Sequence, residues 1–159
     1  MLRILGAAGI KADCVFGPSL SIAQRSNAAG LTDGCVIYAE CRVASRSSSA
    51  AAPVEIALGV ARAGLHDGVA DIVLFDDYIV AFASQTRQDL SGIVALVLAH
   101  EIGHVLLPAP AHTDIGLMQV PWDERALEQF ADRTLLFTAR QGALMRTRLA
   151  LACEMPARH

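Results

Sequence analysis

The chain has 159 residues, of which 53% are hydrophobic and 18% are charged, and its formal net charge is −3. This length and apolar content are expected to form one compact domain that spans residues 1–159 and has a real hydrophobic core. The scattered basic residues argue against a nucleic-acid partner, and no apolar run reaches the roughly 18 to 20 residues of a membrane span.

The N-terminal segment is the first apolar stretch of the chain. Residues 1–8 carry one positive charge, and their apolar run is short for a signal peptide. We therefore expect either a cytoplasmic protein or a secreted one whose leader has already been removed.

The cysteines are spread along the chain, at Cys14, Cys35, Cys41 and Cys153. None has the CxxC spacing of a redox or structural zinc site, and four cysteines do not force a disulfide framework at this length. Cys35 and Cys41 are close enough in sequence to pair across a loop. Free buried thiols are nevertheless the state that we expect.

The segments that read as short strands lie in the first half of the chain. They cover residues 11–16, 36–39 and 54–60, and residues 69–75 form the best candidate. Residues 44–53 are rich in serine and alanine and contain one arginine, so they are expected to form a mobile surface loop.

A short helix and then a long one are predicted after the last strand. Asp76 or Asp77 could cap the short helix, which would run through Ala83. Asp89 or Ser91 could cap the long one.

Further helices are predicted in the C-terminal part of the chain. Asp123 and Glu124 begin one helix, where acidic side chains favour the positive end of the helix dipole. Thr138 and Gln141 have the spacing of a capping box and place a final helix over residues 139–151.

This order of elements predicts an α+β or layered α/β fold. A small mixed sheet would pack on the long helix, and the C-terminal part would be helical. There is no internal repeat and no domain boundary in the sequence.

The long helix contains the pattern HExxH, formed by His100, Glu101 and His104. Residues four apart on a helix are separated by about 40° around the axis and by roughly one turn, so both imidazoles can face one metal ion. Glu101 lies about 100° from His100, beside the metal, where a carboxylate can take a proton from metal-activated water.

The surroundings of the motif strengthen this interpretation. Glu101 is the only charged residue between Gly92 and Leu107. Three polar residues on an otherwise apolar helix would be costly without a shared partner. The alternative is an amphipathic core helix whose histidines bond to neighbours and whose Glu101 faces solvent.

A third ligand is expected after the motif, because catalytic zinc normally takes three protein ligands and leaves one position for water. Pro108 and Pro110 should end the helix near Leu107 and turn the chain back in a stiff loop. His112 can then return to the metal, and Asp114 is a nearby substitute.

The segment from His100 to Met118 resembles the zincin metallopeptidases, and most closely their metzincin branch. That branch has HExxHxxGxxH followed by a methionine turn beneath the metal, and Gly116-Leu117-Met118 looks like such a turn. Small bacterial proteins with HEIGH or HELGH, a loop histidine and then Gly-x-Met are similar too. The resemblance covers about residues 71–122.

Two features depart from the metzincin pattern. Leu107 stands at the position of the helix-ending glycine, and His112 follows His104 by eight residues rather than six. The gluzincin branch takes a glutamate about twenty residues on, and Glu124 has that spacing. The third ligand could therefore be His112, Asp114 or Glu124.

The resemblance implies a zincin-like fold and a zinc-dependent peptidase. Zn²⁺ would be held by His100, His104 and His112, with Glu101 as general base and a peptide or protein as substrate. An edge strand would pair with extended substrate, and residues 54–60 or 69–75 could supply it. Imidazole ligands favour zinc over magnesium or calcium, although iron, nickel or cobalt could occupy the same nitrogens.

A second hypothesis is a catalytically inactive, zincin-like metal-binding or protein-interaction module. Metzincins often stabilise the oxyanion with a tyrosine beyond the methionine turn, whereas Tyr38 and Tyr78 both precede the motif here. A metal-free helical domain is the third hypothesis.

Overall fold

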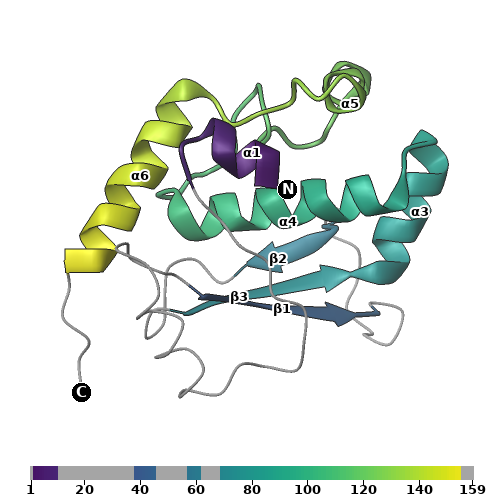
Figure 1. Ribbon diagram of the computed structural model, residues 1–159. Coiled ribbons are helices and arrows are strands. Elements are labelled where there is room, and N and C mark those ends of the chain that lie inside the picture. The colour runs from purple at the N-terminus through teal and green to yellow at the C-terminus, as the bar shows by residue number, and fades with distance from the viewer. Residues whose placement is uncertain (1, 11–37, 46–56, 62–68, 155–159) are drawn as a thin grey trace.

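The structure is a computed structural model that describes residues 2–10, 38–45, 57–61 and 69–154 (Figure 1). The elements, in chain order, are α1 (Leu2–Ala7), β1 (Tyr38–Ala44), β2 (Gly59–Ala61), β3 (Val69–Phe75), α3 (Asp76–Thr86), α4 (Leu90–Leu106), α5 (Glu124–Ala131) and α6 (Ala139–Glu154). The described residues thus form a mixed α+β fold with a small sheet, which confirms the predicted class at that level.

The three described strands form a mixed sheet in the order β1-β3-β2. β1 runs parallel to β3, with Tyr38 opposite Val69, whereas β2 runs antiparallel to it, with Gly59 opposite Leu74. β3 is therefore the central strand of the described sheet, and its bounds agree with the prediction for residues 69–75. β3 therefore cannot supply the free edge that was predicted to pair with substrate. Of the two predicted segments, only 54–60 overlaps an outer strand, which is β2.

Alternation along β3 explains how the sheet packs. Ala70, Ile72 and Leu74 point to one face and are buried, whereas Asp71 and Val73 alternate with them and are only half-buried. The buried face lies against α4, which contacts both β2 and β3. Complete burial of a side chain such as Ile72 stabilises the fold by roughly 1.5–3 kcal/mol relative to leaving it exposed.

Helix α4 lies between the sheet and the helices α1 and α5 (Figure 1). Its almost wholly apolar sequence suits a helix that is covered on several sides. Asp89 caps its start by accepting a hydrogen bond of 2.8 Å from the Gly92 amide. Leu107 is the C-cap, immediately before Pro108, so both predicted ends of this helix are confirmed.

Helix α1 was not predicted, because it is only 6 residues long and has no acidic residue in its first turn. Tertiary contacts supply its stability instead. Leu5 is buried in the core, and the Arg146 guanidinium on α6 donates a hydrogen bond of 2.6 Å to the Ala8 carbonyl. The two ends of the described chain are thereby joined.

The start of α3 corrects one prediction. Strand β3 passes directly into the helix at Phe75, which is the N-cap and makes no side-chain capping bond. Asp76 and Asp77 therefore lie in the first turn, where carboxylates still favour the helix dipole, rather than at the cap. The helix also continues past Ala83 to Thr86.

The C-terminal helices agree with the predictions at their starts. Asp123 caps α5, and Thr138 and Gln141 make both hydrogen bonds of a capping box at the start of α6. Within α6, Met145 is completely buried in the core, whereas Leu144 is exposed.

Several predictions fall wholly or partly outside the described residues. These are the strand at 11–16, the start of the strands at 36–39 and 54–60, most of the loop at 44–53, and the state of Cys14, Cys35 and the Cys153 side chain. Cys41 is described, and it is free but exposed, because it lies on the outer strand β1. The expectation of a buried thiol is wrong at this position.

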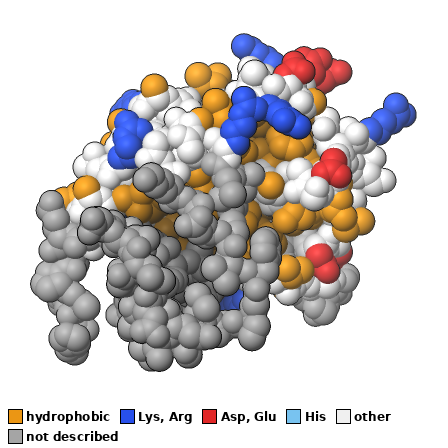
Figure 2. Space-filling view, viewed as in Figure 1, with side chains coloured by type: hydrophobic (Ala, Val, Ile, Leu, Met, Phe, Trp, Pro, Cys, Tyr) orange, Lys and Arg blue, Asp and Glu red, His pale blue; other side chains and the backbone are white. Residues whose placement is uncertain are grey.

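The surface carries charges of both signs. On the face drawn in Figure 2, acidic and basic side chains both occur, with apolar side chains between them. Among the described residues, no helix combines the length and the apolar character that crossing a bilayer requires.

Candidate metal centre

Three histidine side chains converge at one point. His100 and His104 project from α4, and His112 comes from the loop that follows the helix. The Nε2 atom of His104 lies 3.1 Å from Nε2 of His100 and 3.1 Å from Nε2 of His112. The cluster could hold a metal ion, since one donor atom from each ring lies within 4.8 Å of the others.

Protons alone do not satisfy these contacts. An imidazole nitrogen is either a donor or an acceptor, so the Nε2 atom of His104 can direct one N–H along only one of its two 3.1 Å contacts. With neutral rings, the other contact is then left without a well-directed hydrogen bond. A cation at the centre would satisfy all three nitrogens at once.

Burial keeps the most enclosed ring neutral. It lowers the pKa of His100 to about 4, an effect that hydrogen bonding to the Leu117 carbonyl opposes and that the nearby His104 and His112 reinforce. Burial, and then the charge of His112, also lowers the pKa of His104. Neutral imidazoles present the lone pairs that a metal requires.

A single carbonyl oxygen orients the first histidine. The Leu117 carbonyl lies 3.0 Å from Nδ1 of His100, so a neutral ring that donates there directs the lone pair of Nε2 toward the cluster. The same oxygen accepts a hydrogen bond of 3.1 Å from the Trp122 indole. The indole also packs edge-on against His100, with ring centroids 5.3 Å apart.

Glu101 lies inside the protein rather than in solvent. Its side chain is only 4% exposed, which contradicts the alternative in which it faces water. Burial raises the pKa of Glu101 to about 7, and a hydrogen bond from the Ala61 backbone amide on β2 partly offsets the increase. A carboxyl group with this pKa can both accept and release a proton near neutral pH.

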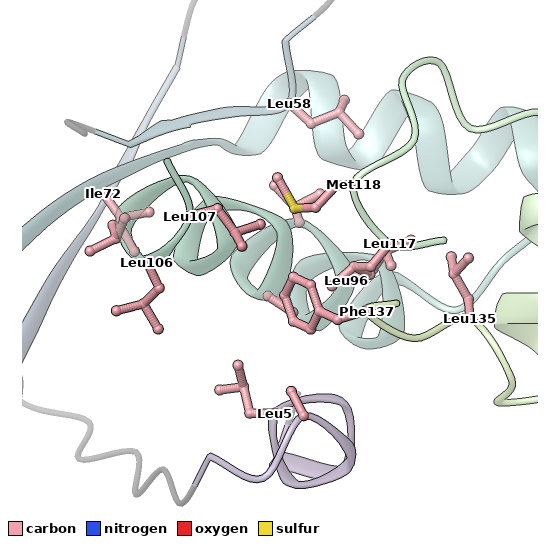
Figure 3. Packing of buried hydrophobic residues seen from close by; sticks show 14 of the residues in the cluster. Leu5, Leu58, Ile72, Leu96, Leu106, Leu107, Leu117, Met118, Leu135 and Phe137 are labelled. Atoms are coloured by element: carbon pink, nitrogen blue, oxygen red, sulfur yellow. The ribbon is translucent and has the colours of Figure 1, made fainter. Parts of the chain in front are cut away.

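Apolar side chains pack against the motif helix at Gly103. Met118 is completely buried, and a Cβ atom placed on Gly103 would overlap with its sulfur. Leu117, Leu96 and Phe137 lie nearby along α4 (Figure 3). The turn predicted at residues 116–118 therefore brings its methionine against the motif helix.

The alternative third ligands do not join the cluster. Asp114 and Glu124 are both exposed, and Glu124 occupies the first turn of α5. His112 is the residue that the structure places beside His100 and His104.

Two contributions to the site were missed in the sequence. These are the Trp122 indole, which packs against His100, and the hydrogen bond from β2 to Glu101. Neither follows from a local pattern, because each depends on how separate elements meet. The tryptophan occurs once in the chain, close behind the methionine turn, and this proximity was the only available signal.

Comparisons with protein-family models, with curated proteins and with solved structures found no match to this chain.

Proposed function

We propose that the protein is a zinc-dependent metallopeptidase in which His100, His104 and His112 hold the metal. The convergence of three imidazole nitrogens at one point is the observation that carries this proposal. Glu101, the next residue after His100 on the same helix, adds a buried carboxyl group. The zincin resemblance of the HExxH segment supports the same activity and a zincin-like fold.

The donor set favours zinc. Zinc–nitrogen bonds of about 2.0–2.1 Å in a tetrahedron separate the donor atoms by roughly 3.3 Å. Two of the nitrogen pairs are 3.1 Å apart, so a small change would accommodate the ion. Iron, nickel and cobalt also bind imidazole, and metal analysis would distinguish them.

Zinc, when bound, would polarise the scissile carbonyl and lower the pKa of water to roughly 7. Glu101 would act as general base and take the proton of the attacking water. It would then act as general acid and deliver that proton to the leaving amine. A carboxyl group whose pKa is about 7 suits both steps.

Strand β2 is the candidate substrate-binding edge. It is the outer strand beside β3 in the described sheet, and its Ala61 amide hydrogen-bonds Glu101. An extended peptide that pairs with β2 would therefore lie close to the general base. This arrangement supports a peptide or protein substrate.

One test combines metal analysis with a substitution. The purified protein should contain one zinc ion per chain, and Glu101→Gln should retain it. The substitution should reduce cleavage of a proteome-derived peptide library by roughly 10²–10⁴-fold, the contribution typical of a general base. Glu128→Gln is the matched control, because Glu128 is exposed on α5.

Absence of stoichiometric metal, or full activity in Glu101→Gln, would rule out the proposed peptidase activity.

A metal-binding or interaction module without activity is the second candidate. Neither tyrosine of the chain follows the motif, and Tyr78 packs against the core from α3, which leaves the oxyanion without the usual tyrosine. Bound zinc without any Glu101-dependent cleavage would favour this module.

A further inference from the structure

Gln141 is a buried polar residue that the proposed chemistry does not use. It lies in the first turn of α6, and its side chain is only 5% exposed. A buried amide needs partners for both its oxygen and its nitrogen, and the identity of these partners shows what the residue holds together.

The two ends of this amide bond to different segments. The oxygen accepts a hydrogen bond of 2.9 Å from the Thr138 amide, which is the ordinary reach of a capping box. The nitrogen donates a hydrogen bond of 3.1 Å to the hydroxyl of Thr113, 28 residues earlier in the chain. Thr113 directly follows His112.

Thr113 closes the loop in which it lies. Its hydroxyl donates to the Ile115 carbonyl at 2.9 Å, and its amide donates to the Met118 carbonyl at 3.1 Å. The turn from Thr113 to Met118 therefore has a hydrogen-bonded base, and Gln141 attaches this base to α6.

The far side of the same turn is held by the backbone. Gly116 has a φ of 79°, and a Cβ atom there would lie 2.9 Å from the Leu136 carbonyl oxygen. The Leu117 amide donates to that carbonyl at 3.0 Å. Gln141 thus fixes one end of a turn whose other end is already held.

The histidines differ in how they are held. His100 and His104 have their spacing from the helix, whereas His112 is exposed on a loop. A loop ligand binds well only if the loop is ordered before the metal arrives, because ordering it later opposes binding. Because Gln141 holds Thr113, the backbone directly after His112 is ordered before the metal binds.

We propose that Gln141 is a positioning residue that holds the His112 loop in its ligating arrangement through Thr113. This inference rests on the proposed metal centre. Its consequence is that α6, which carries none of the three histidines, tunes the metal affinity of the site.

Two substitutions change this hydrogen bond from its opposite ends. Thr113→Val removes the hydroxyl, and with it the bond to the Ile115 carbonyl, but keeps the shape and leaves the α6 cap intact. Gln141→Glu keeps the capping oxygen, since glutamate also forms a capping box, but removes the amide donor. Thr147→Val and Gln85→Glu are the matched controls, because both residues are exposed, and the Thr147 hydroxyl bonds only within α6 among the described contacts.

Zinc affinity, measured by competition with a chromogenic chelator, is the first readout. Each test variant should bind zinc roughly 10-fold more weakly, at the lower end of the effect of losing a supporting partner, and the double variant should be no weaker than the worse single one. The visible spectrum of the cobalt-loaded protein should also change in both. Both controls should match the parent protein.

Hydrogen exchange in the metal-free protein is the second readout. Amides of residues 113–118 should exchange faster in both test variants, while those of α4 stay unchanged as an internal reference for folding. Unchanged zinc affinity together with unchanged exchange would overturn the inference. A parent protein that binds no metal would instead refute the proposed function, and exchange would then decide alone whether Gln141 orders the loop.

Discussion

The sulfur of Met118 lies against the backbone of Gly103, the residue between Glu101 and His104 that has no side chain. A Cβ atom at position 103 would overlap with that sulfur and would also lie 3.0 Å from the Phe137 ring. Met118 and Phe137 are both buried, so neither can move aside freely. Glycine at this position of the motif is therefore required by packing.

Gly103→Ala is therefore expected to destabilise the protein. Alanine favours a helix by about 1 kcal/mol over glycine, but overpacking a closed core costs roughly 1–3 kcal/mol. We expect the free energy of unfolding, measured in urea, to fall by up to about 2 kcal/mol, the difference between these two effects. Gly6→Ala on α1 is the control, since a Cβ atom there has nothing within 4 Å.

A second substitution distinguishes packing from other causes. If Met118 is the obstacle, Gly103→Ala should cost less in a Met118→Ala background, because the cavity accepts the added methyl group. Equal costs in the two backgrounds would contradict the proposed overlap.

The local parts of the site could be read from the sequence. Helical periodicity sets the spacing of His100 and His104, and Pro108 and Pro110 mark where the helix must end. The strand at 69–75 and the caps at Asp89 and Asp123 also follow from neighbouring residues. Such features depend on backbone geometry that a few residues determine.

Contacts between distant elements could not be read in this way. Nothing near Ala61 indicates that its amide meets Glu101, and the capping pattern at Gln141 gives no sign of its bond to Thr113. The order of the strands was also open, because the sequence does not specify which strand lies in the middle of a sheet. These features follow only from how helices and strands pack.

Gly59→Ala should impair catalysis more than metal binding. A Cβ atom at this position of β2 would lie 3.0 Å from a carboxyl oxygen of Glu101 and 3.1 Å from its Cγ. Displacing Glu101, the proposed general base, should lower kcat at least about tenfold, while the zinc content stays at one per chain. Steady-state kinetics measures the effect on catalysis, and elemental analysis measures the zinc content. Loss of zinc in this variant would contradict the expectation that Gly59→Ala affects catalysis and not metal binding.

His112→Ala should weaken zinc binding more than any substitution of the alternative ligands. Loss of a direct ligand should exceed the 10–100-fold effect that removal of a supporting partner typically causes. Asp114→Ala and Glu124→Ala should keep the affinity of the parent protein, because both side chains lie outside the cluster. Isothermal titration with zinc would measure all three, and a large loss in Glu124→Ala would reassign the third ligand.

The metal-free protein should show opposing pH effects on stability. The pKa of His100 is lowered to about 4, whereas that of an unfolded histidine is about 6.5. The contribution of the neutral ring to the free energy of unfolding is therefore complete above about pH 6.5 and is lost as the pH falls toward 4. The pKa of Glu101 is raised to about 7, so its contribution is complete below about 4.5 and is lost as the pH rises toward 7. The two slopes have opposite signs between about pH 4.5 and 6.5 and largely cancel there.

Glu101→Gln should remove one side of this balance. The free energy of unfolding of the chelator-treated variant should rise from pH 4.5 to 6.5 by up to about 3 kcal/mol more than that of the parent protein, because the histidine effect is no longer opposed. Above pH 7 the variant should also be the more stable of the two, since it buries no ionised carboxylate. Urea denaturation across this range measures both differences, with Glu128→Gln as the exposed control. Parallel profiles for the parent protein and Glu101→Gln would mean that Glu101 ionises in the folded protein as readily as it does in the unfolded chain.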